Sequence, residues 1–197
     1  MISPPRYARP VPRLRRSKSA LLVVDMQGFF LDPRSPAHLP ASAKALPGTR
    51  RLIEAFRGAG RPAAFTVYAT PEGGPMTRWW NKPCRKGSPH ARLFRGLDPE
   101  GGYPVFVKGG YSAFRGTGLL RWLKARGISD LVVAGVMTDL CVESTVREAF
   151  EKGFRVFVAP DACASKDRAL HNAALAVMAR GFAYLAASGE LSKAVRS

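Results

Sequence analysis

Three side chains with the chemistry of a nucleophilic hydrolase stand at the ends of short apolar runs. Asp25 follows residues 20–24, Lys108 follows residues 105–107, and Cys141 comes shortly after residues 131–136. A carboxylate can take a proton, an ammonium can hold a negative charge nearby, and a thiolate can attack a carbonyl carbon. Charged groups that end apolar segments are costly to bury unless they pair or do chemistry. The three residues together predict catalysis by a cysteine.

Each residue alone also has a simpler explanation. Asp25 and Lys108 could form a buried ion pair that only ties two strands together. Cys141 could be a small apolar residue of the core. The joint occurrence at three strand ends favours the catalytic interpretation.

Cys141 is placed where a helix should begin, after a tight turn at residues 137–140. Helix N-termini carry unpaired N–H groups and a partial positive charge. Both lower the pKa of a thiol. We therefore expect an acidified thiol at this position.

The elements that must position these residues alternate between apolar runs and helical patterns. This alternation indicates βαβ units and a largely parallel sheet in an α/β fold. The carboxyl ends of parallel strands share one edge of the sheet, where ligands bind. Strands are predicted at about residues 20–25, 62–68, 104–108, 130–136, 154–159 and 182–186. Helices are predicted after Pro47-Gly48 up to about residue 58, around residues 119–126, from about 141 to 152, and from about 168 to 180.

The chain has 197 residues, of which 46% are hydrophobic, and this size is sufficient for one well-buried domain. We expect that domain at residues 20–197, preceded by a basic, proline-rich arm at residues 1–19 that is extended or disordered. No apolar run approaches membrane-spanning length, and the N-terminus does not resemble a secretory signal. The sequence thus predicts a soluble, cytoplasmic protein with no membrane partner.

A formal net charge of +17 raises the possibility of nucleic-acid binding. The arm holds 6 of the 31 basic residues, and the remainder are spread along the chain without an RNA-binding or zinc-finger signature. A solvated basic surface is the preferred explanation, and nucleic acid is an unlikely partner. A non-catalytic basic module that binds nucleic acid through the arm stays as an alternative.

Cysteine and histidine usage argues against structural metal and against disulfides. The 3 cysteines and 3 histidines are scattered, without the spacing of a zinc site. Cys84 is interpreted as a surface thiol, and Cys163 and His171 as packing or local hydrogen-bonding residues. We expect no metal and no cofactor.

The segment from Ala69 to Tyr103 is long and rich in Gly, Pro, Trp and basic residues, and long loops in compact domains are usually functional lids or binding loops. Aromatic side chains near the catalytic edge are candidates to enclose a flat substrate. The candidate pocket residues are Phe30, Trp79, Trp80, Tyr111 and Phe114. For Trp79 and Trp80, a place in the core or in a subunit interface is an equal alternative.

Three separated motifs make the chain resemble the isochorismatase-like cysteine hydrolases, whose members include nicotinamidases and carbamoylsarcosine amidases. The resemblance covers about residues 20–190. The motifs are Leu21-Leu22-Val23-Val24-Asp25-Met26-Gln27 with Phe29-Phe30, then Val107-Lys108 with Tyr111-Ser112-Ala113-Phe114, then residues 135–149 from Gly135 through Cys141 to Ala149, with Asp161-Ala162 and His171 beyond.

This resemblance implies a three-layer Rossmann-like sandwich with six strands in the order 3-2-1-4-5-6. It implies a triad of Asp25, Lys108 and Cys141, a cis peptide between Val136 and Met137, and an oxyanion hole formed by the backbone amides of Met137 and Cys141. It also implies a homo-oligomer.

One departure from the family pattern and one retained residue narrow the expected reaction. The metal-binding Asp-x-His-x(3)-His pattern of nicotinamidase-like members is absent from residues 68–74, which disfavours nicotinamidase activity. Members that hydrolyse the vinyl ether of isochorismate can lack the cysteine, which this chain keeps. We therefore predict cleavage of a C–N bond in a small amide, imide or carbamoyl substrate, with vinyl-ether hydrolysis as the alternative. Gly28 replaces a common Asn and is expected to loosen the wall beside Asp25.

Overall fold

The protein is built on a parallel β-sheet, seen in a computed structural model that describes residues 8–97 and 102–197. The described residues form a 6-stranded sheet in the order β3-β2-β1-β4-β5-β6, and each neighbouring pair is parallel. The predicted order is confirmed. The strands are β1 Ser19–Val24, β2 Ala63–Tyr68, β3 Val105–Lys108, β4 Asp130–Val136, β5 Arg155–Ala164 and β6 Ala183–Leu185.

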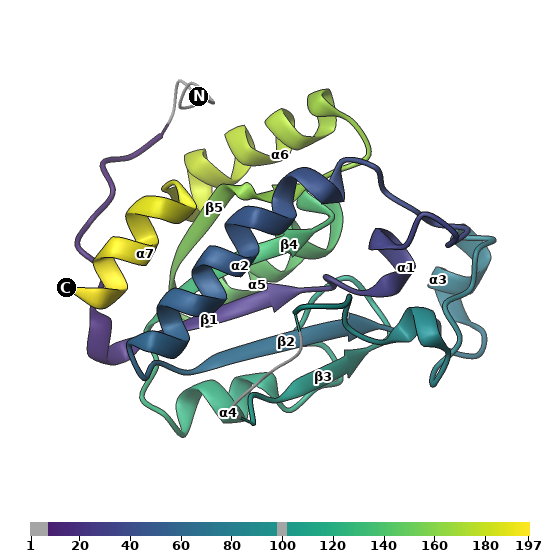
Figure 1. Cartoon of the computed structure of the whole chain (residues 1–197), viewed down its shortest axis with the longest axis horizontal. Coiled ribbons are helices and arrows are strands. Elements are labelled where there is room, and N and C mark those ends of the chain that lie inside the picture. The colour runs from purple at the N-terminus through teal and green to yellow at the C-terminus, as the bar shows by residue number, and fades with distance from the viewer. Residues whose placement is uncertain (1–7, 98–101) are drawn as a thin grey trace.

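Helices cover both faces of this sheet (Figure 1). The longer helices are α2 Ser42–Gly58, α5 Glu143–Glu151, α6 Arg168–Gly181 and α7 Ser188–Arg196. The short ones are α1 Gly28–Leu31, α3 Gly74–Trp79, α4 Leu119–Lys124, the 3-10 turns Arg16–Lys18 and Pro89–Ala91, and a π-helical turn at Thr138–Val142. Figure 1 shows α1 and α3 beyond the arrowheads of β1, β2 and β3, at the carboxyl edge of the sheet.

Two apolar layers hold the helices to the sheet. On one face, Leu21 and Phe65 pack with residues of α2 and α7, such as Leu52 and Leu191. On the other face, residues of β1 and β4 pack with α4, α5 and α6. Alternate residues of the buried strands supply the two layers, since successive strand side chains point to opposite faces. Every residue of β1, β2 and β4 is buried, as expected for the interior of a doubly covered parallel sheet.

Two helical predictions need correction. The first long helix begins at Ser42 rather than after Pro47, so Pro47 lies inside it. At its start, the amide of Lys44 bonds the carbonyl of Ala41 in a tight turn. The helix therefore begins before the proline is reached. Helix α7, which packs on α2, was not predicted at all.

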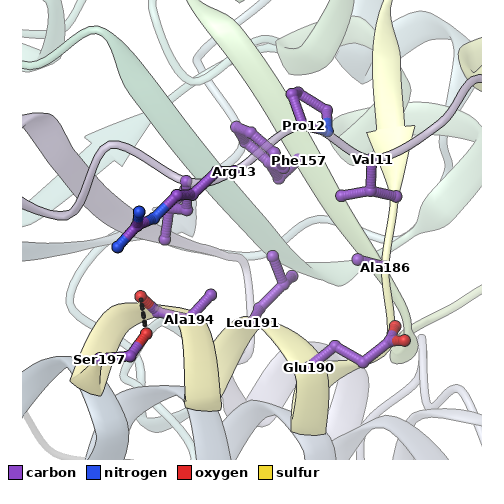
Figure 2. Close-up of a pocket in the computed structure, with 10 residues that line it drawn as sticks. Val11, Pro12, Arg13, Phe157, Ala186, Glu190, Leu191, Ala194 and Ser197 are labelled. Atoms are coloured by element: carbon purple, nitrogen blue, oxygen red, sulfur yellow. Dashed lines mark hydrogen bonds between the residues drawn. The ribbon is translucent and has the colours of Figure 1, made fainter.

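The N-terminal arm is bound to the domain in its described part, residues 8–18; residues 1–7 lie outside the described residues. Leu14 is buried in the core. The Asp130 carboxylate accepts hydrogen bonds from the Arg15 amide (2.7 Å), from Arg15 Nε (2.9 Å) and from Arg155 Nε (2.9 Å). Burial raises the pKa of Asp130, but the hydrogen bonds from Arg155 and Arg15 outweigh it and hold that pKa below its ordinary value. Figure 2 shows Val11, Pro12 and Arg13 of the arm across an open hollow from α7.

Replacing Asp130 with Asn should therefore loosen the arm. The substitution removes the charge that Arg15 and Arg155 share, and we expect it to lower the free energy of unfolding by about 2 kcal/mol in urea titrations. A depressed carboxyl pKa stabilises the fold above the unfolded-state pKa of about 4. The difference between the wild type and Asp130→Asn should then shrink as the pH falls through the lowered pKa of the native state.

The control for this prediction is Glu143→Gln. Glu143 pairs with Arg147 on the same helix, at 2.6 Å. Surface pairs at this spacing contribute only about 0.3–0.5 kcal/mol. Equal effects of the two substitutions would contradict a specific role of Asp130 in holding the arm.

No helix within residues 8–97 and 102–197 has both the length and the apolar character needed to cross a membrane.

Candidate active site

Strand ends bring Asp25, Lys108 and Cys141 into direct contact. Lys108 Nζ lies 2.7 Å from Asp25 Oδ2 and donates hydrogen bonds to Cys141 Sγ (3.2 Å) and to the Gly110 carbonyl (2.8 Å). All three residues are buried: the exposed fraction is 0% for Asp25, 1% for Lys108 and 5% for Cys141. The Lys108 ammonium thus has two hydrogen-bond acceptors, and the Asp25 carboxylate beside it supplies the opposite charge.

Asp25 is held by the strand beside it. Its backbone amide bonds the Thr66 carbonyl (3.1 Å), and Thr66 Oγ1 donates to Asp25 Oδ1 (2.6 Å). The Asp25 backbone has a positive φ of 51°, a region in which Asp and Asn are enriched among non-glycine residues. Thr66 was not predicted as part of the site; a polar residue inside the apolar strand Ala63–Tyr68 is the signal that could have found it.

Gly135 lets β4 approach β1 immediately next to the site. Its φ is 123°, and a Cβ atom built there would lie 2.0 Å from the Val24 carbonyl oxygen. Only glycine fits this position. The contact brings the residue before Asp25 against the segment that leads to Cys141. The peptide bond that follows, between Val136 and Met137, is cis.

Cys141 lies in the π-helical turn Thr138–Val142, directly before α5. The turn is held from outside by Thr138 Oγ1, which lies 2.8 Å from His171 Nδ1 on α6, and by a hydrogen bond from Ser165 to Asp139. His171 thus makes the local hydrogen bond expected for it. Cys163 is buried in the core, as also expected.

The electrostatics of Cys141 differ from the sequence expectation. Burial, together with the neighbouring Asp25 carboxylate, raises the pKa of the Cys141 thiol to about 12, although the Lys108 charge opposes the rise. For Lys108, burial lowers the pKa, but the charges of Asp25 and Cys141 outweigh it and the net shift is upward. The helix start therefore does not produce a thiolate in the free protein. In the free protein, the Cys141 thiol is therefore neutral beside the Lys108 ammonium.

This protonation state predicts how the free protein reacts with iodoacetamide. Well below a thiol's pKa, the thiolate fraction rises tenfold for each pH unit. Alkylation of Cys141, followed by peptide mass spectrometry, should accelerate steadily from about pH 7 to about pH 10 without a plateau. The variant Cys163→Ala removes a second buried thiol from the measurement. A plateau near neutral pH would mean that the thiolate is already formed.

Gln27 closes the long loop onto this edge of the sheet. Its side-chain amide donates to the Tyr68 carbonyl (3.0 Å), to the His90 carbonyl (3.1 Å) and to Cys84 Sγ (3.5 Å). Cys84 is 1% exposed, and burial raises its pKa to about 11. The prediction of a surface thiol is therefore wrong: the partner of Cys84 lies 57 residues away in the sequence.

Gly28 does not loosen the wall beside Asp25. Its amide bonds the Arg92 carbonyl (3.0 Å), and a Cβ atom there would lie 3.3 Å from His90 Cα. The missing side chain lets the loop pack tightly against α1 instead. The loop residues 98–101 lie outside the described residues.

The predicted pocket residues divide into two groups. Trp80 Nε1 donates to the Tyr111 hydroxyl (2.9 Å), which joins the long loop to the segment after Lys108. Trp79 is 78% exposed, so neither tryptophan is a core plug. The two phenylalanines are buried in the apolar layers: Phe114 stacks on Phe154 at 6.1 Å in one, and Phe30 packs edge-on against Phe29 in the other. Their place in a substrate pocket stays a prediction.

Tyr68 is a further neighbour of the triad. Its ring centroid lies 5.7 Å from Lys108 Nζ. Burial raises the pKa of its hydroxyl. Among the described residues, no group of three His, Cys, Asp or Glu side chains is placed to hold a metal ion. The hollow of Figure 2 is lined by the arm, β5 and α7, and by no residue of the triad.

The described residues thus form a parallel α/β sheet whose carboxyl edge carries a buried cluster of Cys141, Lys108 and Asp25. The Isochorismatase domain model matches residues 19–190, and the chain therefore belongs to the isochorismatase-like cysteine hydrolase family.

Similar proteins include both sequence relatives and solved structures. Nicotinamidase 3 of Arabidopsis thaliana is 34% identical, with 90% of this chain and 88% of the relative covered. Ureidoacrylate amidohydrolase RutB of Methylobacterium radiotolerans is 32% identical, covering 86% of this chain and 76% of the relative. The N-carbamoylsarcosine amidase structure from Thermoplasma acidophilum has a TM-score of 0.79 and 29% identity, covering 87% of this chain and 96% of that one.

Proposed function

We propose that this protein hydrolyses a C–N bond of a small amide, imide or carbamoyl compound, using Cys141 as nucleophile, without a metal ion or other cofactor. The observation that carries the proposal is the buried contact set in which Lys108 Nζ lies 2.7 Å from Asp25 Oδ2 and 3.2 Å from Cys141 Sγ. The relatives named as amide-hydrolysing enzymes support the reaction class.

The first half-reaction forms a thioester. Asp25 takes the proton of the Cys141 thiol as Sγ attacks the carbonyl carbon, so that no free thiolate has to exist beforehand. The Lys108 ammonium stabilises the charge on sulfur, which opposes the effect of burial on the pKa. We assign the backbone amides of Met137 and Cys141 to the developing oxyanion. When the tetrahedral intermediate collapses, the C–N bond breaks and the leaving nitrogen receives the proton from Asp25.

The second half-reaction uses the same carboxylate. Asp25 takes a proton from water as the water oxygen attacks the thioester carbonyl carbon. The C–S bond then breaks, the acid product leaves, and the proton returns to Cys141. Asp25 thus acts as base and then acid in each half-reaction, as a single carboxylate can when the two half-reactions run in sequence.

We propose that the Trp80–Tyr111 pair and the exposed Trp79 border the entrance to the site. Trp79 and Trp80 lie in the segment after β2, and Tyr111 lies in the segment after β3. We propose that they contact the acyl part of the substrate. The expectation of a homo-oligomer stays a prediction.

The test is a screen for ammonia release over three kinds of amide: nicotinamide, ureido acids such as ureidoacrylate, and N-carbamoyl amino acids. A substrate should also leave a trapped acyl adduct on Cys141, measured as added intact mass after rapid acid quench. Turnover should survive dialysis against EDTA. Loss of turnover that zinc or another divalent ion restores would overturn the metal-free assignment.

A further inference from the structure

Strand β3, which ends at Lys108, and strand β4, which leads to Cys141, are not neighbours in the sheet. In the order β3-β2-β1-β4, two strands separate them. Three inter-strand spacings of about 4.8 Å amount to roughly 14 Å. Yet Lys108 Nζ lies 3.2 Å from Cys141 Sγ. Because Lys108 has a long side chain with many rotamers, sheet pairing alone does not fix this distance.

The segment after β3 crosses this gap. Gly110 accepts a hydrogen bond from Lys108 Nζ through its carbonyl (2.8 Å). Three residues later, the amide of Ala113 donates to Thr145 Oγ1 (3.0 Å). Thr145 Oγ1 in turn donates to the Cys141 carbonyl (2.6 Å). A continuous chain of contacts therefore runs from the ammonium of Lys108 to the backbone of Cys141.

A second contact fixes the same segment to α5. Ser112 Oγ donates to Glu148 Oε2 (2.5 Å) and accepts from the Phe114 amide (3.2 Å). Burial raises the pKa of Glu148, but its hydrogen bonds from Ser112 and Lys152 outweigh this and lower the pKa overall. Glu148 is thus ionised at neutral pH and is a strong acceptor for Ser112.

We propose that Thr145 is a positioning residue that sets the separation of Lys108 and Cys141 across the sheet, with the Ser112–Glu148 contact as its support. This inference rests on the proposed function of the triad. Thr145 touches none of the reacting atoms. It acts by joining the Ala113 amide to the Cys141 carbonyl through a single fully buried hydroxyl.

A threonine hydroxyl that bonds the carbonyl four residues earlier is common in helices, so the contact with Cys141 alone would signify little. Thr49 shows the ordinary case. It is equally buried, and its Oγ1 donates to the Ala45 carbonyl (2.9 Å) within α2, with a longer contact to Ala162 (3.3 Å). The difference at Thr145 is the bond from Ala113, which comes from the segment that holds Lys108.

The test compares Thr145→Val with Thr49→Val. Valine keeps the shape of threonine and removes the hydroxyl. Both variants therefore lose the bond to the carbonyl four residues earlier, and Thr145→Val also loses the bond from the Ala113 amide. Both should unfold at lower urea concentration. Only Thr145→Val should lower kcat, by about 10- to 100-fold with KM nearly unchanged, because the reacting groups are misplaced. Thr145→Ser should recover most of the lost kcat.

A second measurement does not depend on a substrate. If Lys108 moves away from Cys141, the charge that opposes the rise of the thiol pKa weakens, and alkylation by iodoacetamide should slow at every pH. The charged and titratable groups that face this thiol are Asp25 after β1, Lys108 on β3 and Tyr68 on β2. Of these, only Lys108 is bonded to the segment that Thr145 holds. Thr49→Val should alkylate at the wild-type rate.

The outcomes separate the two proposals. Wild-type kcat and alkylation rate in a folded Thr145→Val protein would overturn the positioning role, as would equal losses in Thr145→Val and Thr49→Val. If Thr145→Val does not fold, kcat and the alkylation rate are measured on Ser112→Ala instead, because this substitution at a half-buried site releases the same segment from α5. If Cys141→Ala retains turnover, the proposed mechanism itself has failed, whatever the Thr145 variants do.

Discussion

Cys141→Ala is expected to lose at least about 10⁴-fold in kcat/KM on any substrate found by ammonia release, because removing a nucleophile forces the reaction through direct attack of water. The fold should persist, since alanine leaves only a small cavity where a buried sulfur stood. The acyl adduct seen by mass should disappear. Turnover is measured by ammonia release, and circular dichroism spectra of the same preparations check that the fold persists.

Cys163→Ala is the matched control for this loss. Cys163 and Cys141 are both 5% exposed, and burial raises the pKa of each thiol to about 12. They differ in their electrostatic neighbours: Asp25 and Lys108 act on the Cys141 thiol, whereas the Gly135 backbone and Asp161 act on the Cys163 thiol. We expect Cys163→Ala to keep wild-type turnover at some cost in stability. Equal activity of both variants would remove Cys141 as nucleophile and would favour the vinyl-ether alternative, in which the cysteine is not required.

The sheet could be predicted closely because each strand is a short apolar run bounded by polar or turn residues. The ends of β1, β2, β3 and β4 agree with the sequence prediction to within a residue or two. The last part of β5 was missed. Residues 160–164 rejoin the sheet after a register shift between Val133 and Gly135. Such a bulge depends on the partner strand, which local patterning does not contain.

The meeting of Asp25, Lys108 and Cys141 could be predicted because each lies at or shortly after the end of a strand, and these strand ends share one edge of the sheet. The electrostatics of these residues could not. A helix start favours a thiolate, but burial and the Asp25 carboxylate act in the opposite direction and prevail at Cys141. Burial of this kind results from tertiary packing over the carboxyl edge. The same applies to Cys84, which is buried by a contact with Gln27, and to Thr145, whose bond with Ala113 links segments 32 residues apart.

Variants of Asp25 and Lys108 can distinguish a structural role of their ion pair from a catalytic one. Lys108→Met should leave the Asp25 carboxylate buried without its cation, and we expect a loss of about 3–5 kcal/mol in the free energy of unfolding. Asp25→Asn should leave Lys108 uncompensated in the same way. Asparagine suits the positive φ of this position and can still accept the bond from Thr66. Combining the two substitutions removes both charges, so much of the stability should return.

Turnover should not return with it. Asp25 is the proposed proton carrier, and losing a general base costs about 10²- to 10⁴-fold. Lys108 is the proposed partner of the charge on sulfur. The double variant should therefore be as stable as, or nearly as stable as, the wild type in urea titrations, and inactive in the ammonia assay. Recovery of turnover together with stability would show that the pair only ties β1 to β3. Because both outcomes are measured on the same folded protein, a buried ion pair that serves structure is distinguished from one that moves a proton.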